Sequence, residues 1–233
     1  AYWASDRIYE VFRDEKNYTD YSNTITGMTT GNNSQYLRIW HEIEVFKIGI
    51  GYGTMEEISN SKKYFIPYSK GGMRKNWYGN NEYVVNWSKH KDFNRSKTTL
   101  QHLYLKEALT WSFVTSGKFS SRYLPIGFLW DVAGSPSFIN DKNNTKYFLG
   151  LLCTDLTNRL LKLINPTLNI QAIDLENLPI IFSEMHKPEI DFLVEQNISI
   201  SKTDWDSFET SWDLEVHQLL DETKQGQVPN TIE

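Results

Sequence analysis

Residues 71–87 read Gly71-Gly72-Met73-Arg74-Lys75-Asn76-Trp77-Tyr78-Gly79-Asn80-Asn81-Glu82-Tyr83-Val84-Val85-Asn86-Trp87. The Gly-Asn-Asn turn ahead of two β-branched valines predicts a β-hairpin over 77–87. Two cations precede this hairpin, and aromatic and amide side chains occupy its strands and tip. The combination suits a ligand that is both anionic and planar. The alternative is that the paired aromatic side chains pack against each other across the hairpin.

Outward from this hairpin, the sequence predicts a mixed sheet with helices at its periphery. The predicted elements are an amphipathic helix over 2–15, two strands within 24–40 around a glycine-rich turn, a strand over 63–68, a helix over 98–109, a strand over 110–116, a β-rich region over 117–138, a long helix over 146–164 and a second helix over about 188–195. The chain beyond residue 200 is acidic, and 223–233 has the composition of a linker. We therefore expect an α+β fold with a mixed, mainly antiparallel sheet, peripheral helices and a helical C-terminal part.

The composition is that of a folded protein without a membrane span. The chain has 233 residues, 39% of them hydrophobic, which suffices for one large domain or two small ones. Its mean hydropathy is −0.51, and no apolar run approaches the length of a transmembrane helix. Cys153 is the only cysteine, so no internal disulfide is possible, and its apolar surroundings favour a buried structural thiol. No secretory leader precedes the first helical pattern, so we expect a cytoplasmic protein and a segment of a longer chain.

Charge is distributed unevenly along the chain. The net charge is −5, yet residues 62–122 hold 12 lysines and arginines against 3 aspartates and glutamates. The other residues hold 12 basic against 26 acidic side chains. Overall acidity argues against indiscriminate binding of polyanions, whereas the middle third has the charge for a basic face. The alternative is that folding spreads these cations over several sides of the domain.

Several segments resemble the target-recognition regions of adenine-specific DNA methyltransferases. Residues 27–40 read Gly27-Met28-Thr29-Thr30-Gly31-Asn32-Asn33-Ser34-Gln35-Tyr36-Leu37-Arg38-Ile39-Trp40 and are similar to the G-x-x-T-G-x-N-x-x-[FY] opening of recognition domains in type IIG enzymes. Residues 115–125 resemble a further part of these domains. The helix and extended Leu-Pro-Ile within 148–180 also resemble the end of recognition domains in type I specificity subunits. Residues 71–87 and 203–213 most closely resemble the C-terminal region of PglX-like methyltransferases of BREX phage-defence systems.

This resemblance implies that the chain contributes DNA specificity, with catalysis located elsewhere. It implies a DNA target-recognition domain over 1–182 and a helical, acidic extension with a linker over 183–233. A complete enzyme of this family also has a glycine-rich loop for S-adenosylmethionine and an Asn/Asp-Pro-Pro-aromatic tetrapeptide that holds a flipped adenine. The nearest string here, Asn165-Pro166-Thr167-Leu168, lacks the second proline and the aromatic residue, and we interpret it as a helix end. We assign no catalytic residue, cofactor or metal site to this chain.

The expected DNA contacts begin with the basic segment. Phosphate contacts are expected from Lys70, Arg74, Lys75, Lys89, Lys91, Arg95, Lys118 and Arg122. Base-edge contacts are expected from Arg74, Asn80 and Asn81, because arginine matches guanine and amides match adenine in the major groove.

Two further motifs are weighed in the same way. The turn Thr30-Gly31-Asn32-Asn33 is expected to present backbone amides to a phosphate, the alternative being a tight turn without a ligand. Trp77 and Tyr78 are expected at a base or sugar, the alternative being packing within the protein. The alternating Gly49, Gly51 and Gly53 form only a weak phosphate motif without a following helix, so we interpret them as a strand edge or bulge.

The sequence leaves two other function classes open. The acidic, tryptophan-rich C-terminal part could dock other proteins of the defence system, which would make the chain an interaction scaffold. A carbohydrate-binding module is suggested only by the abundance of Trp, Tyr and Asn. The expected partners are double-stranded DNA, the upstream methyltransferase domain of the same protein and other defence-system proteins, with no membrane. S-adenosylmethionine is expected to bind the parent enzyme outside this segment.

Overall fold

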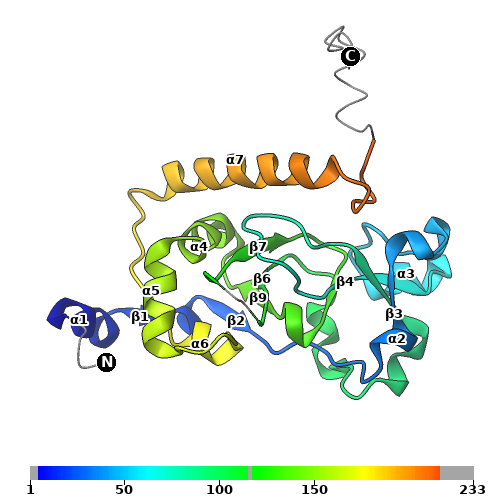
Figure 1. Cartoon of the computed structure of the whole chain (residues 1–233), viewed down its shortest axis with the longest axis horizontal. Coiled ribbons are helices and arrows are strands. Elements are labelled where there is room, and N and C mark those ends of the chain that lie inside the picture. The colour runs from blue at the N-terminus through cyan, green and yellow to red at the C-terminus, as the bar shows by residue number, and fades with distance from the viewer. Residues whose placement is uncertain (1–4, 115–116, 216–233) are drawn as a thin grey trace, which may run out of the picture.

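A computed structural model describes residues 5–114 and 117–215, which fold around two four-stranded sheets (Figure 1). In the first sheet the strand order is β2-β9-β6-β7, and every neighbouring pair is antiparallel. In the second the order is β3-β5-β4-β8, with β8 parallel to β4. The strands are β1 (Lys16–Asn17), β2 (Ser22–Thr24), β3 (Leu37–Ile39), β4 (Phe65–Ser69), β5 (Tyr83–Asn86), β6 (Ala108–Trp111), β7 (Ser121–Leu124), β8 (Leu129–Trp130), β9 (Pro136–Ile139) and β10 (Pro179–Ile180). The short strands β1 and β10 pair separately.

Helices surround these sheets, so the predicted α+β class with a mainly antiparallel, mixed sheet is confirmed. The α-helices are α1 (Asp6–Asp14), α2 (Asn33–Tyr36), α3 (Met55–Ser61), α4 (Thr145–Leu152), α5 (Asp155–Ile164), α6 (Ala172–Glu176) and α7 (Lys187–Asp206). The 3₁₀ helices are η1 (Tyr18–Asp20), η2 (Trp40–Glu42), η3 (Val45–Lys47), η4 (Trp87–Asp92), η5 (Thr98–Leu103), η6 (Val132–Gly134) and η7 (Lys142–Asn144). None of the helices within the described residues combines the length and apolarity needed to cross a bilayer.

The first sheet is the middle layer of the molecule, because both of its faces are covered. Along β6, Ala108 packs in the core between the two sheets, whereas Leu109 and Trp111 pack in a second core beneath the helices. This alternation follows from the two-residue period of a strand. The helical layer includes α4 and α5, whose buried leucines belong to the second core. The fold thus consists of sheet, sheet and helices, with α7 outermost (Figure 1).

The predicted hairpin over 77–87 is wrong. Its second half forms β5, but β5 pairs with β3 and β4, and residues 70–82 form a long loop between β4 and β5. Trp77 instead adds to the edge of β7, where its N–H donates to the Ser121 carbonyl at 3.0 Å and its carbonyl accepts from Tyr123 N–H at 2.8 Å. Trp77 and Trp87 therefore pack against different cores. The turn prediction failed because a more distant strand edge provided the hydrogen-bond partners.

Three predicted helices also have different limits. The helix over 146–164 divides into α4 and α5, because the Thr154 hydroxyl accepts the Thr157 N–H at 3.2 Å and begins a new helix. The region 98–109 contains η5 and then the start of β6, and Leu105 between them has a positive φ of 61°. The helix opened by Pro188 continues to Asp206, well beyond 195, because no glycine or proline interrupts it. Of the strands predicted within 24–40, β3 lies there, whereas β2 already ends at Thr24, and the two strands belong to different sheets.

Asp131, which is only 2% exposed, joins the ends of β4 and β8 to the segment around Met28. Its carboxylate accepts from the Lys70 ammonium at 2.8 Å, the Tyr68 hydroxyl at 3.3 Å and the Ala133 N–H at 2.9 Å. Burial first, and then the negative charge of Asp131, raise the pKa of Tyr68 well above its usual value. The Lys70 side chain is 24% exposed, so this ion pair is shielded from solvent on one side only.

Replacing Asp131 with alanine should destabilise the whole domain. We expect Asp131→Ala to lower the free energy of unfolding by about 2–4 kcal/mol, because it strands a half-buried ammonium and removes a helix cap. Asp131→Asn, which keeps acceptor atoms, should cost roughly half as much. Denaturant titration followed by tryptophan fluorescence measures both. Asp141→Ala is a matched control, because Asp141 caps η7 in the same way but is exposed. An equal loss in the Asp131 and Asp141 variants would contradict the role assigned to Asp131.

Candidate nucleic-acid interface

The turn at residues 30–33 is held internally. The Thr30 hydroxyl, in a residue 2% exposed, donates to the Asn33 side chain at 2.6 Å, and Asn32 caps the short helix α2 by accepting the Gln35 N–H. Gly31 has a φ of 81°, and a Cβ at this position would lie 2.5 Å from the Asn94 side chain. The geometry is therefore that of a tight turn packed against the segment that carries Arg95, and it explains why glycine is needed there.

The 70–82 loop carries many of the predicted contacts, and most of them are engaged within the protein. Lys75 lies over the Trp205 ring, with 5.2 Å between its Nζ and the ring centroid, and Tyr78 lies beneath Lys202 of α7 at 5.5 Å. Asn80 closes the loop by donating to the Met73 carbonyl at 2.7 Å. Arg74, by contrast, is exposed.

Three of the predicted DNA contacts are not available at the surface, because two are buried and one is bound within the protein. Asn81 is 4% exposed and Arg122 is 1% exposed, while Lys70 is bound to Asp131. Burial lowers the pKa of Arg122 to about 10, and its guanidinium donates to the Ser112 hydroxyl at 3.3 Å. In this arrangement neither Asn81 nor Arg122 reaches a ligand at the surface.

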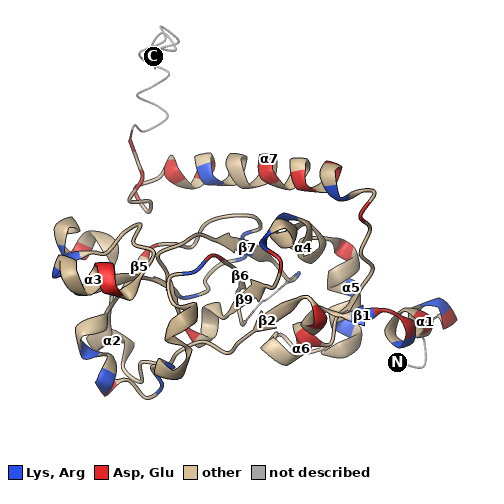
Figure 2. Cartoon of the chain, turned by 180° about the vertical axis from the view of Figure 1, so that it is seen from behind, with Lys and Arg blue, Asp and Glu red and all other residues tan. Residues whose placement is uncertain are grey.

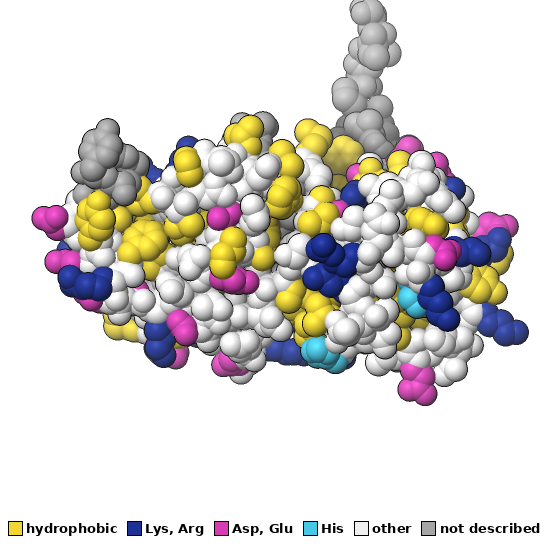
Figure 3. Space-filling model, turned by 90° about the horizontal axis from the view of Figure 1, so that it is seen from below, with side chains coloured by type: hydrophobic (Ala, Val, Ile, Leu, Met, Phe, Trp, Pro, Cys, Tyr) yellow, Lys and Arg dark blue, Asp and Glu magenta, His cyan; other side chains and the backbone are white. Residues whose placement is uncertain are grey.

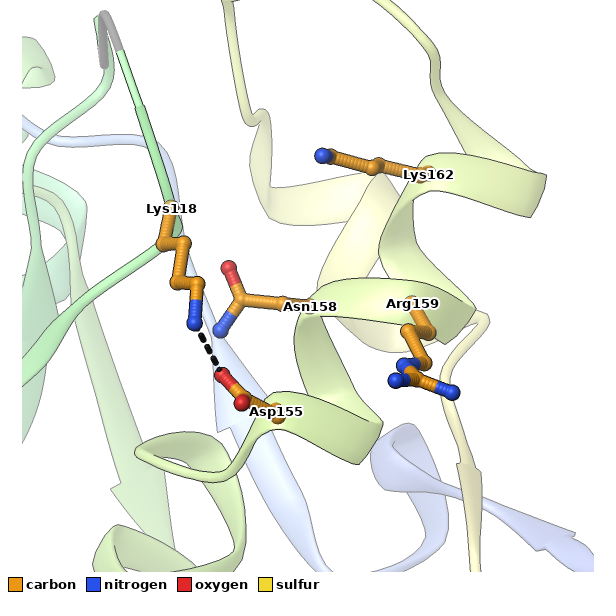
Figure 4. A pocket seen from close by; sticks show the side chains of 5 residues that line it. All are labelled: Lys118, Asp155, Asn158, Arg159 and Lys162. Carbon is orange, nitrogen blue, oxygen red and sulfur yellow. Dashed lines mark hydrogen bonds and ion pairs between the residues drawn. The ribbon is translucent and has the colours of Figure 1, made fainter.

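A cleft between residues 117–119 and α5 brings together cations from separate parts of the chain (Figure 4). It measures about 180 Å³ and is lined by Lys118, Asp155, Asn158, Arg159 and Lys162. A wider depression of about 490 Å³ shares Lys118 and Lys162 with it and extends over residues 166–168. Lys118 was predicted from the sequence, whereas Asn158, Arg159 and Lys162 were not. The spacing of Arg159 and Lys162, three residues apart and both exposed on α5, is the signal that could have identified them.

Asn158 fixes the wall of the cleft opposite α5. Its side-chain oxygen accepts the Phe119 N–H at 2.5 Å, and its amide donates to the Thr154 carbonyl at 3.0 Å. Asn158 is 8% exposed and Phe119 is 4% exposed, so this contact is protected from water. The segment that carries Lys118 is therefore attached to α5 and not freely moving beside it.

The electrostatics of the cleft are cationic with one acidic member. Lys118 donates to Asp155 at 2.7 Å and, with smaller contributions from Arg159 and Arg74, lowers the pKa of Asp155. No ion pair or hydrogen bond involving the side chains of Arg159, Lys162 or Arg74 occurs among the described residues. Arginine and lysine side chains in such a position can bind phosphate oxygens.

The other cations of the basic segment lie elsewhere. Lys89 and Lys91 are exposed on η4, and Arg95 follows η4 in the chain. These three cations lie on the opposite side of the first sheet from α5. α2 and α5 are at opposite ends of the domain (Figure 1), and basic and acidic residues are both distributed along the chain between them (Figure 2). The face in Figure 3 likewise shows basic side chains interspersed with acidic and uncharged ones. Folding thus divides the basic segment between separate regions.

The glycine-rich segment 49–54 is occupied by contacts within the protein. Contrary to our expectation, helix α3 does follow Gly53. The N–H groups of Gly53 and Thr54 both donate to the Glu57 carboxylate, so they are not free to bind a phosphate. Gly49 donates to the Phe65 carbonyl beside β4, consistent with a strand-edge role. Asn165 ends α5, as expected for a helix end. Within 5–114 and 117–215 no cluster of His, Cys, Asp and Glu could hold a metal ion.

Cys153 should react slowly with alkylating reagents. It follows α4, its thiol donates to the Ser121 carbonyl at 3.3 Å, and burial raises its pKa to about 11. At pH 8 the small thiolate fraction should make alkylation by iodoacetamide roughly a hundredfold slower than for an exposed cysteine. The rate should keep rising with pH towards 11, and unfolding in guanidinium should restore rapid labelling. Rapid labelling of the folded protein at pH 8 would contradict the burial of this thiol.

Most of this chain is similar in sequence to two known proteins. Over 236 residues, taking in 94% of this chain, the sequence is 38% identical to the adenine-specific methyltransferase PglX of Lacticaseibacillus casei (strain Zhang), of which it covers 19%. Over 198 residues, taking in 83% of the chain, it is 30% identical to the adenine-specific methyltransferase BrxX of Escherichia coli O9:H4 (strain HS), of which it covers 16%. No protein-family model matches the chain. The chain thus spans about a fifth or less of the length of these two methyltransferases and is similar in sequence to that part of each.

Proposed function

We propose that this chain is the DNA target-recognition part of an adenine-specific methyltransferase of a BREX-type phage-defence system. The observation that carries the proposal is the 38% identity to PglX over 94% of the chain. Methyl transfer, with S-adenosylmethionine as the donor, would take place on another part of the longer protein, in the cytoplasm where chromosomal DNA is found. The domain over 1–182 would contact DNA, and the C-terminal part over 183–233, of which 216–233 lie outside the described residues, would serve a separate role.

The cleft supports a role in holding the DNA backbone. Arg159 and Lys162 project from successive turns of a helix whose other face is packed in the core, so their positions are fixed without being neutralised. Phosphate contacts of this kind orient a protein on a duplex and do not read its sequence. Lys118 and the exposed Arg74 would add to the same contact surface, while Lys118 exchanges its bond to Asp155 for one to phosphate.

Base reading requires polar side chains that remain accessible. Of the residues predicted for this role, Arg74 is exposed, whereas Asn80 is engaged in closing its loop and Asn81 is buried. We therefore propose Arg74 as the base-reading candidate within the 70–82 loop. The turn at 30–33, with Lys89 and Arg95 nearby in the chain's other cationic region, would form a separate contact with the duplex.

Removing the two α5 cations should weaken DNA binding and reduce its salt dependence. For Arg159→Ala with Lys162→Ala, the slope of log affinity against log salt should become shallower by roughly two units, because each lost phosphate contact removes about 0.9. Fluorescence anisotropy with duplex DNA across a salt series measures this change. Arg7→Ala with Lys106→Ala is the matched control, since it removes the same charge from exposed positions outside the cleft. Equal slopes for the two double variants would contradict a role for the cleft.

Neutralising the acidic member of the cleft should have the opposite effect. Asp155→Asn removes a negative charge and releases Lys118, so affinity for duplex DNA should rise by about two- to fivefold at low salt. Asp141→Asn, which changes an exposed carboxylate outside the cleft, should leave affinity within error of the unsubstituted chain. Unchanged or weaker binding by Asp155→Asn in the same anisotropy assay would count against phosphate binding at this site.

A further inference from the structure

Helix α7 has apolar side chains on two opposite faces. The inner face packs against α4, where Gly150 permits close approach: a Cβ on Gly150 would lie 2.9 Å from Val194. The outer face carries Phe192, Leu193 and Ile200, which are 61%, 49% and 68% exposed. With 3.6 residues per turn, Phe192 and Ile200 point away from the side of the helix on which Val194 lies, so the two sets occupy different sides of α7.

A helix on the surface of a domain normally has one apolar stripe and one polar face. Here Phe192 and Ile200 lie eight residues apart, which places both on one side of a helix about 30 Å long, and the exposed Met185 lies in the turn just before this helix. A shallow depression between Phe192 and Ile200 is lined by Glu195, Gln196 and Ser199. Figure 1 shows α7 as the outermost element, with the domain on one side only. The apolar outer face therefore has the pattern of a helix enclosed between two layers, of which one is present.

We propose that this outer face docks against an apolar protein surface with a basic rim, supplied by the remaining part of the methyltransferase chain. The relatives are about five times longer than this segment, so most of such a protein lies outside these residues and is tethered close to α7. The inference rests on the proposed function only in taking the partner to be the rest of a longer methyltransferase.

The charges around the outer face determine the kind of partner. Its rim is acidic, with exposed Glu184, Glu189, Asp204 and Glu209. The two lysines of α7 do not offset this charge, because Lys187 pairs with Asp191, and Lys202 pairs with Asp206 and Asp213. An acidic rim repels a DNA backbone and complements lysines and arginines on a protein surface.

A second copy of this chain fits the same face less well. An antiparallel two-fold contact that places Leu193 opposite Ile200 of the other copy also places Glu189 opposite Asp204, because both pairs share the same midpoint on the helix. Like charges facing each other across an interface disfavour that partner. The tethered remainder of the methyltransferase has no such restriction.

Hydroxyl-radical footprinting tests the proposal by comparing this 233-residue chain with a full-length methyltransferase that contains it. Oxidation of Met185 and Phe192 should fall about fivefold in the full-length protein, because an interface core excludes water. Met73 and Phe46 are the internal references, since they are equally exposed at 83% and 66% but lie away from α7. In the full-length protein, Phe192→Ser with Ile200→Ser should restore the oxidation of Met185, whereas the matched Val45→Ser with Phe46→Ser should not.

Two outcomes would overturn the proposal. Equal oxidation of Met185 and Phe192 in the two proteins would show that nothing covers this face. Sedimentation of the free chain as a dimer that Phe192→Ser with Ile200→Ser dissociates would assign the face to a second copy. The free chain is expected to bind DNA equally well with and without these substitutions. If the unsubstituted chain does not bind DNA, that result contradicts the proposed function but not the docking surface.

Discussion

The buried carboxylate of Asp131 sets the starting point of the 70–82 loop, and much of the remaining arrangement depends on that loop. Asp131 binds Lys70 directly, and the next residue, Gly71, lies against the backbone of Ala133, where a Cβ would be 2.2 Å from the carbonyl oxygen. The loop therefore leaves β4 in a defined direction. Removing the carboxylate would leave a polar group of Tyr68 and a cation near the core without their partner, which is costly at low exposure.

The loop then connects the two sheets to the outer helix and to the cleft. Trp77 extends the edge of β7, Tyr78 and Lys75 meet α7, and Arg74 lies near enough to Asp155 to influence its ionisation. The other two walls of the cleft are the segment before β7 and helix α5. The hydrogen bond from Phe119 N–H to the Asn158 side chain joins these two walls. The cationic surface is thus formed by three segments distant in sequence. Its geometry depends on tertiary contacts and not on the local conformation of any one segment.

This dependence explains what the sequence could and could not predict. The α+β class, the strand over 63–68 and the β-rich region over 117–138 followed from local residue preferences, and the structure agrees with them. The break between α4 and α5 is also signalled locally, by the Thr154-Asp155 cap, whereas Leu152, Leu156, Leu160 and Leu163 recur at helical spacing and favour one continuous helix.

The hairpin over 77–87 and the exposure of Arg122 could not be inferred in this way. Trp77 found its hydrogen-bond partners on β7, and Arg122 was buried because it lies on a strand with both faces covered. Likewise, Arg159 and Lys162 stood out as a pair only once α5 was placed beside Lys118. Residue types indicated the chemistry of this protein, whereas the meeting of strands and helices decided which residues remain available for it.

The distribution of charge over the folded chain bears on how the two surfaces would work together. The chain is acidic overall, and its cleft offers only a few cations, so the number of phosphates it can neutralise is small. Because each contact contributes less than one unit to the salt dependence, the cleft alone would give weak binding at physiological salt. The acidic rim around the apolar outer face of α7 would keep DNA away from that side while a protein layer occupies the face. DNA affinity and orientation would then arise jointly, with this segment fixing the position of a duplex that the rest of the longer protein helps to hold.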